Sequence, residues 1–350
     1  MTATDPPQGV DLDRLTPWFR AHVPDADPTR PLRIELITGG KSNLTYEVTD
    51  DVRRWVLRRP PLGHVLATAH DMVREFRVIS GLANSAVPVP AAIALCEDTA
   101  VNDAPFYVME FVDGRIPKTS AAIAAFTPAE AGGTSEAVVD VLADLHSVDP
   151  VDARLADFGR PDGFLGRNLA RWGTQWAASK TRPLPELDEI GRRLVSALPA
   201  SGPAAIVHGD YRLDNTMLAP DDPTRIVAVL DWEMSTLGDP LTDLGLLLTY
   251  WGNRDTRFVT PILDPDRGWM TTDAIARRYA ARTGRDLSAL DFYVVFAHYK
   301  LAIILEGINA RFQMGKTVGD GFDHMAPLVS SLAERALEVA DDSALTALHA

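Results

Sequence analysis

The chain reads HGDYRLDN at residues 208–215, and a short apolar run at 226–230 leads into Asp231. Within this pattern Asp210 and Asn215 stand five residues apart, and the second carboxylate comes directly after the apolar run. Phosphoryl transfer needs such a set of groups. One carboxylate orients the attacking hydroxyl and accepts its proton, while an amide oxygen and another carboxylate hold Mg²⁺ on the phosphates. The stretch therefore indicates phosphoryl-transfer chemistry.

The same residues also have purely structural interpretations. Either Asp210 or Asn215, taken alone, is a residue type that often caps a turn. A single histidine, His208, has no second metal ligand at a suitable spacing and is interpreted as structural. Asp239 precedes a proline and is expected to cap a helix. The functional interpretation therefore depends on the ordered set of Asp210, Asn215 and Asp231.

At these residues the sequence resembles the aminoglycoside phosphotransferase family, a branch of the protein-kinase-like fold. The matching segments are HGDYRLDN at 208–215, LDWE at 230–233 and GDPLTDL at 238–244. The resemblance implies that Asp210 is the catalytic base and that Asn215 and Asp231 are Mg²⁺ ligands. It also implies ATP as the phosphate donor, with GTP left open. Asp243 is expected to tie its helix to the loop.

The apolar pattern and the resemblance predict an α+β, two-lobed protein-kinase-like fold. A small N-terminal β-sheet lobe with one helix would precede a larger, mainly helical C-terminal lobe. The expected strands are 33–38, 44–49, 54–59, 91–97 and 105–111, and the expected helix of this lobe is 69–83. The expected divisions are an N-terminal helical extension at 1–30, a nucleotide-binding lobe at 31–112, and a catalytic and substrate-binding lobe at 113–350.

The turn GGKSN at 39–43 joins the first two expected strands. Glycine has no Cβ, so such a turn can lay backbone N–H groups over phosphates, although Gly-Gly also makes plain hairpins. The nucleotide-binding residues expected here are Gly39, Gly40, Ser42 and Asn43.

Arg58 stands on the third expected strand, where kinase-like proteins place a phosphate-binding lysine. Arginine can hold phosphate oxygens with two parallel hydrogen bonds, but it is not an equivalent point charge. Glu75, on the next helix, corresponds to the glutamate that pairs with that lysine. Arg59 is the competing candidate, although strand alternation would place it on the opposite face of the sheet.

The strand FYVMEFVDG at 106–114 resembles the family hinge. By that resemblance, the backbones of Glu110 and Val112 would bind the adenine edge. An ordinary buried strand that ends in an Asp-Gly turn would have the same sequence, because backbone contacts do not depend on the side chains.

Three segments are similar to a narrower branch, the kinase-like domain fused to acyl-CoA dehydrogenases in some eukaryotes and its free-standing bacterial relatives. They are LRRPP with GHVL at 57–66, AHDMVREF at 69–76, and YKLAI at 299–303 with Gly307 and Arg311. The resemblance implies a hydroxylated acyl-CoA thioester as the acceptor. Expected substrate contacts are Arg212 and Trp232 near Asp210, and Tyr299 and Arg311 in the late helical segment, which also holds His298 and Lys300. Alternatively, Tyr299 belongs to the core face of a helix.

The net charge, the cysteine count and the apolar stretches limit the partners and the location of this chain. The 350 residues carry a formal net charge of −14 and no dense basic run, so no nucleic-acid partner is expected. A single cysteine, Cys96, and an N-terminus without an apolar signal segment favour the cytoplasm. The longest apolar stretches are too short or too interrupted to cross a membrane. The predicted partner is a small-molecule hydroxyl substrate.

Three rival functions remain open at this point. A nucleotide-binding pseudokinase is suggested only by arginine at position 58. A metal-dependent hydrolase would use the same carboxylates, but would not need the glycine turn, Arg58 and Glu75. An aminoglycoside or other small-alcohol kinase needs only a different acceptor pocket, and an aminoglycoside enzyme would favour an acidic one.

Overall fold

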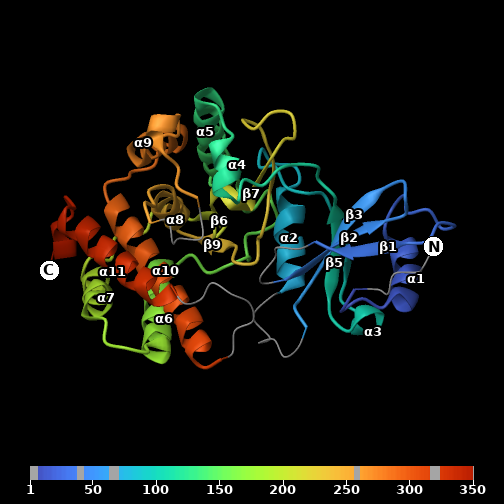
Figure 1. Cartoon of the computed structure of the whole chain (residues 1–350), viewed down its shortest axis with the longest axis horizontal. Helices are drawn as coiled ribbons and strands as arrows, with labels where there is room; N and C mark the ends of the chain where they lie inside the picture. Colours follow the sequence, from blue (N-terminus) through green and yellow to red (C-terminus); the bar gives the residue numbers. More distant parts are fainter. Residues whose placement is uncertain (1–6, 38–42, 63–70, 256–260, 316–323, 350) are drawn as a thin grey trace.

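The computed structural model describes residues 7–37, 43–62, 71–255, 261–315 and 324–349. It has a β-sheet lobe at the N-terminal end and a helical lobe at the C-terminal end, with helix α2 (Met72–Leu82) between the sheet and the helical part (Figure 1). The predicted α+β, protein-kinase-like fold class is confirmed. The domain boundaries stay a prediction.

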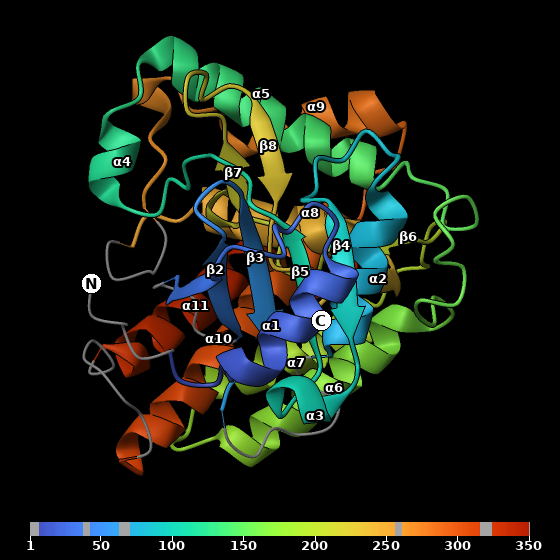
Figure 2. The ribbon, with the colours of Figure 1, turned by 90° about the vertical axis from the view of Figure 1, so that its right-hand side faces the viewer.

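The sheet of the N-terminal lobe is antiparallel, with the strand order β1-β2-β3-β5-β4. Its strands are β1 (Arg33–Leu36), β2 (Leu44–Thr49), β3 (Arg54–Arg59), β4 (Ala92–Cys96) and β5 (Phe106–Glu110). All five lie within one or two residues of the predicted ranges. Helix α1 (Leu12–His22) and the short α3 (Thr99–Asn102) lie over the outer face of the sheet (Figure 2). Of these two, only α3 was not expected from the sequence.

Side chains alternate between the two faces of this sheet, as they do in any strand. On the outer face, Trp55 meets Phe19 of α1 edge to face, with ring centroids 5.3 Å apart. On the opposite face, towards α2, the β3–β5 register pairs Arg58 with Tyr107. The expected extension at 1–30 thus contributes α1 to the core of this lobe, while the inner face carries charged and polar groups.

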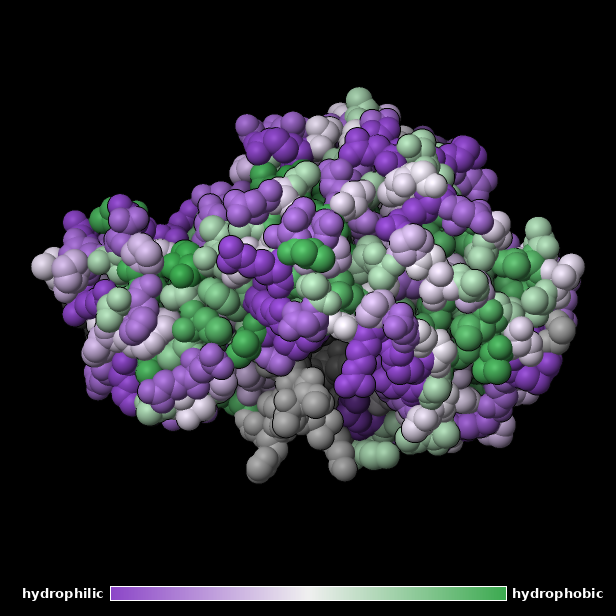
Figure 3. Space-filling model, turned by 180° about the vertical axis from the view of Figure 1, so that it is seen from behind, coloured by the Kyte–Doolittle hydropathy of each residue, from purple (hydrophilic) through white to green (hydrophobic). Residues whose placement is uncertain are grey.

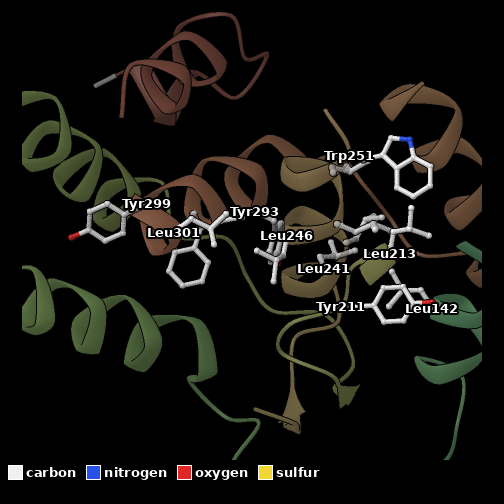
Figure 4. Packing of buried hydrophobic residues seen from close by; sticks show 14 of the residues in the cluster. Leu142, Tyr211, Leu213, Leu241, Leu246, Trp251, Tyr293, Tyr299 and Leu301 are labelled. Atoms are coloured by element: carbon white, nitrogen blue, oxygen red, sulfur yellow. The ribbon is translucent and has the colours of Figure 1, made fainter. Parts of the chain in front are cut away.

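The C-terminal lobe is built around the 24-residue helix α10 (Leu290–Gln313), which packs against the helices on either side of it. These are α6 (Phe164–Ser179), α7 (Pro185–Ser196), α8 (Leu241–Trp251) and α11 (Met325–Asp341). Figure 4 shows Tyr293, Tyr299 and Leu301 of α10 in the same packed core as Leu241 and Leu246 of α8. Within the described residues, no helix is both long enough and apolar enough to cross a membrane.

The remaining elements of this lobe surround the predicted catalytic segment. Two small antiparallel sheets pair β6 (Ala205–Val207) with β9 (Thr236–Gly238) and β7 (Thr216–Leu218) with β8 (Ile226–Val229). The helices are α4 (Ser120–Ala124), α5 (Pro128–Leu145) and α9 (Thr272–Thr283), with short 3₁₀ turns η1 (Leu213–Asn215), η2 (Pro265–Arg267) and η3 (Thr346–His349). The predicted HGDYRLDN loop therefore runs from the end of β6 into β7.

Gly245 of α8 allows α8 and α10 to approach closely. A Cβ placed there would lie 2.6 Å from the backbone carbonyl of Tyr293. Tyr293 also donates its hydroxyl proton to Asp239, just before α8, at 2.8 Å. The crossing of α8 and α10 therefore fixes the helix that carries Asp243.

We expect Gly245→Ala to lower the free energy of unfolding by about 1–3 kcal/mol, because the backbone of α10 must shift to accept the methyl group. Denaturant titration of both proteins measures the change. The control is Gly307→Ala in α10, where a Cβ meets nothing within 4 Å. That change should be neutral or stabilise by up to about 1 kcal/mol, since alanine is the better helix former. Equal effects of the two substitutions would contradict the close crossing.

Candidate active site

Asp243 of α8 holds the loop after β6 by hydrogen bonds to its backbone. The backbone N–H groups of His208 and Gly209 donate to its carboxylate at 2.6 and 2.8 Å. Burial alone would raise the pKa of Asp243, but the bond to His146 and the backbone donors keep it below its ordinary value. The expected tie between this helix and the loop is present as a buried charge-assisted contact.

His208 has the structural role that the sequence suggested. Its Nε2 lies 2.9 Å from the carbonyl oxygen of Leu230, and its ring is 4.6 Å from that of Trp232. Gly209 follows with a φ of 85°, and a Cβ there would lie 2.6 Å from the carbonyl oxygen of Met234. Glycine is therefore required just before Asp210.

Asp210 and Asn215 lie in direct contact. The side-chain amide of Asn215 donates to Asp210 twice, to its backbone oxygen at 2.9 Å and to Oδ2 at 3.0 Å. Arg212 places its Nε 3.3 Å from the same Oδ2. Because both side-chain contacts involve Oδ2, we expect Oδ1 to be the oxygen of Asp210 that accepts a proton. The amide nitrogen of Asn215 is turned to Asp210, so its oxygen is on the other side of the amide.

The β7–β8 hairpin brings Asp231 to the same place. Its register pairs Thr216 with Val229, and the N–H of Leu230 donates to the backbone oxygen of Asn215 at 2.9 Å. Asp231 itself has a φ of 67°, in the left-handed region that few residues besides glycine, asparagine and aspartate adopt. Such backbone conformations gather at functional sites.

Arg58 joins the two lobes at this point. Its Nη2 donates to Oδ1 of Asp231 at 2.6 Å, and its Nε lies 2.8 Å from Oε2 of Glu75 in α2. The Arg58 side chain is only 14% exposed and that of Glu75 only 2%. The expected Arg58–Glu75 pair is therefore present, and Asp231 is a third member that the sequence did not reveal.

Glu75 is the most heavily contacted of these groups. Besides Arg58, it accepts hydrogen bonds from Tyr107 at 3.0 Å and from Asn43 at 2.8 Å. Burial raises the pKa of Glu75 to about 7, because the loss of hydration outweighs the attraction of Arg58. Asn43 also donates to Glu233 at 3.1 Å. Asn43, expected to bind nucleotide, thus faces the acidic side of the cleft through its amide nitrogen.

Arg59 lies on the other side of the sheet, as strand alternation predicted. Its Nη1 donates to the backbone oxygens of Gly9 and of Asn102, the latter at 3.2 Å. Arg59 therefore holds the N-terminal segment and α3 to the sheet, while Arg58 faces Asp231.

The remaining nucleotide-binding predictions are only partly visible. Gly39, Gly40 and Ser42 lie outside the described residues. The N–H of Glu110 donates to the oxygen of Ala91 at 2.9 Å. Because this N–H already has a partner within the sheet, the group of Glu110 that would bind the adenine edge is its backbone carbonyl. Val112 follows the end of β5 and is half-buried.

Two predicted substrate contacts need correction. Trp232 is 4% exposed and donates its indole N–H to Val229, so it fills the core beneath the loop. Tyr299 is 3% exposed and packs against α7, which favours the alternative that it belongs to the core face of α10. Sequence patterns did not separate these side chains from site residues, because both lie next to polar neighbours along the chain.

The other two substrate candidates lie far apart. Arg212 is beside Asp210, pairs with Asp214 at 3.1 Å and lies over the ring of Tyr250. Arg311 is exposed near the end of α10, about 16 Å along the helix from Lys300. Lys300, in contrast, donates to the backbone oxygen of Gly209 at 2.8 Å. It is the residue of the late segment that reaches the catalytic loop.

The donors near Asp231 suit a metal that is shared with phosphates. No group of three histidine, cysteine or acidic side chains in the described part of the chain forms a metal cage. Mg²⁺ is usually bound by one or two carboxylates, with water and substrate phosphates completing the shell. The amide oxygen of Asn215 and the carboxylate of Asp231, which is 32% exposed, fit that requirement.

Comparison with known proteins agrees with this geometry. The model of the phosphotransferase enzyme family matches residues 33–293, which include both sides of the cleft. The chain belongs to this family. A structure from Ralstonia eutropha, provisionally assigned as an aminoglycoside phosphotransferase, is 33% identical with a TM-score of 0.82. The match covers 94% of this chain and 98% of that one.

More distant structures share the fold. Choline kinase from Cryptosporidium parvum has a TM-score of 0.64 at 14% identity, covering 97% of this chain and 98% of that one. An aminoglycoside phosphotransferase solved with GDP and kanamycin has a TM-score of 0.62 at 16% identity, and the match covers 91% of this chain and 98% of that one. At these identities the likeness shows the fold alone. The predicted resemblance to the aminoglycoside phosphotransferase family is confirmed.

Curated relatives come from the predicted narrower branch. Acyl-CoA dehydrogenase family member 10 of Mus musculus is 33% identical over 317 residues, which are 89% of this chain and 30% of that protein. Member 11 of Rattus norvegicus is 32% identical over 342 residues, which are 95% of this chain and 44% of that protein. The chain thus spans less than half the length of these relatives.

Proposed function

We propose that this chain is a phosphotransferase that moves the γ-phosphate of Mg²⁺-bound ATP to a hydroxyl of a small molecule. The observation that carries the proposal is that Arg58 of the sheet lobe binds Asp231, while the hairpin that ends at Asp231 is bonded to the backbone of Asn215, the partner of Asp210. A hydrolase would have no need for a cation placed on the opposite lobe by a buried glutamate. GTP is an alternative donor, since adenine and guanine would both be read by backbone groups.

Each residue then has a defined task. Oδ1 of Asp210 accepts the proton of the acceptor hydroxyl as its oxygen forms a bond to the γ-phosphorus, and the bond to the bridging oxygen breaks. Arg58, oriented by Glu75, holds phosphate oxygens with its guanidinium. Asn215 and Asp231 would hold Mg²⁺, which supplies neutralisation of the phosphate charge. Arg212 and Asn215 keep Asp210 in place.

The acceptor that we propose is a hydroxyacyl-CoA thioester. Support comes from the relatives, whose names place this kind of domain in acyl-CoA dehydrogenase family proteins at about one third sequence identity. The aminoglycoside enzyme with bound kanamycin is only 16% identical, so its ligand carries no weight here. We also propose the cytoplasm as the location, where ATP is available and a buried free cysteine such as Cys96 stays reduced.

Asp210→Asn should reduce turnover by roughly 10²-fold or more while nucleotide affinity stays within about two-fold, because a general base contributes in that range. ADP release at saturating ATP and hydroxyacyl-CoA measures turnover, and calorimetry measures affinity. The same change at the exposed Asp221, which pairs with Arg225 at 3.3 Å, is the control. Undiminished turnover in Asp210→Asn would remove this residue from the role of base.

Arg58→Ala should weaken ATP affinity by roughly 10-fold or more, since a charge-assisted contact to phosphate is lost. Arg59→Ala, one residue along the strand, should leave affinity nearly unchanged and lower thermal stability instead, because it binds Gly9 and Asn102. Arg58→Lys should recover part of the affinity. If Arg59→Ala costs more ATP affinity than Arg58→Ala at equal folded fraction, the assignment of Arg58 is wrong.

A further inference from the structure

A cavity of about 550 Å³ lies beside the catalytic loop and is lined by Gly209 of that loop. Its walls come from α6, from α10 and from residues 233–236, with Gly209 and Asp243 among the lining residues. Figure 3 shows strongly hydrophilic side chains beside a hollow near the middle of the face that it draws. The volume is in the range of sites that take a small-molecule ligand.

The cavity is lined by an excess of positive charge. Its cations are Arg74, Arg160, Arg167, Arg171 and Lys300, against the two carboxylates Glu233 and Asp243. Both carboxylates already have partners, the first in Asn43 and the second in the N–H groups of the catalytic loop. The chain as a whole has a net charge of −14, so this local excess of positive charge runs against the overall charge and would attract an anionic ligand.

None of the five cations is neutralised by a carboxylate of the described residues within 4 Å. Four of them donate hydrogen bonds to neutral oxygens instead. Arg74 donates to the backbone oxygens of Phe158 and Ser235. Arg167 donates to the backbone oxygens of Arg160 and Asp162, and Arg171 donates to the side-chain oxygen of Asn168. Lys300 donates to the backbone oxygen of Gly209. These hydrogen bonds leave the positive charges unneutralised, although Lys300 is also attracted by the nearby carboxylates of Asp210 and Asp243.

The cations are arranged in two tiers. Arg160, Arg167 and Arg171 are exposed at the mouth, and Arg167 and Arg171 are four residues apart on α6, so they lie on the same face of that helix. Arg74 and Lys300 are half-buried further in. Burial lowers the pKa of Lys300, because an ammonium charge is less stable away from water.

We propose that this cavity binds the phosphate groups of the acceptor, so that the acceptor is a polyanion bearing phosphate. The identification of the ligand as the acceptor rests on the proposed function. Guanidinium groups at the mouth match phosphate oxygens bidentately, and Trp172 and Phe296 supply apolar wall for the rest of the molecule. A polycation such as an aminoglycoside would meet repulsion here.

Lys300 connects this site to the chemistry. Its Nζ holds the backbone oxygen of Gly209, the residue directly before Asp210, while its side chain lines the cavity. A phosphate beside Lys300 is therefore placed next to the loop that carries the base. Lys300 is a positioning residue in this scheme, not a catalytic one.

The test is calorimetry on the full chain with saturating Mg²⁺ and a non-hydrolysable ATP analogue, so that the nucleotide cleft is filled. The probes are coenzyme A, pantetheine, which lacks the phosphates, and inorganic pyrophosphate. We expect coenzyme A to bind, pantetheine to bind at least 10-fold more weakly, and pyrophosphate to compete with coenzyme A. Arg167→Gln and Arg171→Gln should each weaken coenzyme A binding by about 10-fold.

Both arginines are exposed, so these variants should fold, and the exposed Arg225→Gln is the matched control. Equal affinity for coenzyme A and pantetheine, or no loss in both α6 variants, would overturn the phosphate site even if the chain proves to be an active kinase. Arginine-dependent binding of coenzyme A without any ADP release would support the site and count against the proposed function.

Discussion

The structure depends on one charged contact, the bridge that Arg58 makes between Glu75 and Asp231. Arg58 and Glu75 belong to the sheet lobe, and Asp231 follows a hairpin of the helical lobe. Removing one member would leave the others as uncompensated charges in a poorly hydrated cleft, which is strongly unfavourable. The contact therefore fixes how the two lobes face each other, and it places a cation opposite the carboxylates that phosphate chemistry needs.

A second charged group, the carboxylate of Asp243, fixes the position of the catalytic loop. Its oxygens accept the N–H groups of two consecutive loop residues, and the close crossing of α8 on α10 at Gly245 fixes its position. Lys300 reaches the same loop from α10. Asp210 is thus held from the interior by rigid helices, and its own side chain needs only Asn215 and Arg212 to be oriented.

The sequence predicted the parts of this arrangement that are encoded by short patterns. Strand alternation separated Arg58 from Arg59, and the ordered set of Asp210, Asn215 and Asp231 indicated phosphoryl-transfer chemistry. It did not predict that Asp231 binds Arg58, because residues 173 positions apart meet only through the fold. It also offered Trp232 as a substrate contact and left Tyr299 open between a substrate contact and the core face of a helix, since tertiary burial is not visible in local spacing. The four-residue spacing of Arg167 and Arg171 was a readable signal that went unused.

The most direct test of the account is the Mg²⁺ dependence of ATP binding in Asp231→Asn, measured by calorimetry beside the parent chain. The substitution keeps the size of the side chain and removes its charge. The account predicts that Mg²⁺ strengthens ATP binding to the parent by at least about 10-fold and to Asp231→Asn hardly at all, since the main charged ligand is lost. An identical Mg²⁺ effect in both proteins would contradict the placement of the metal and phosphates between Arg58 and Asp231.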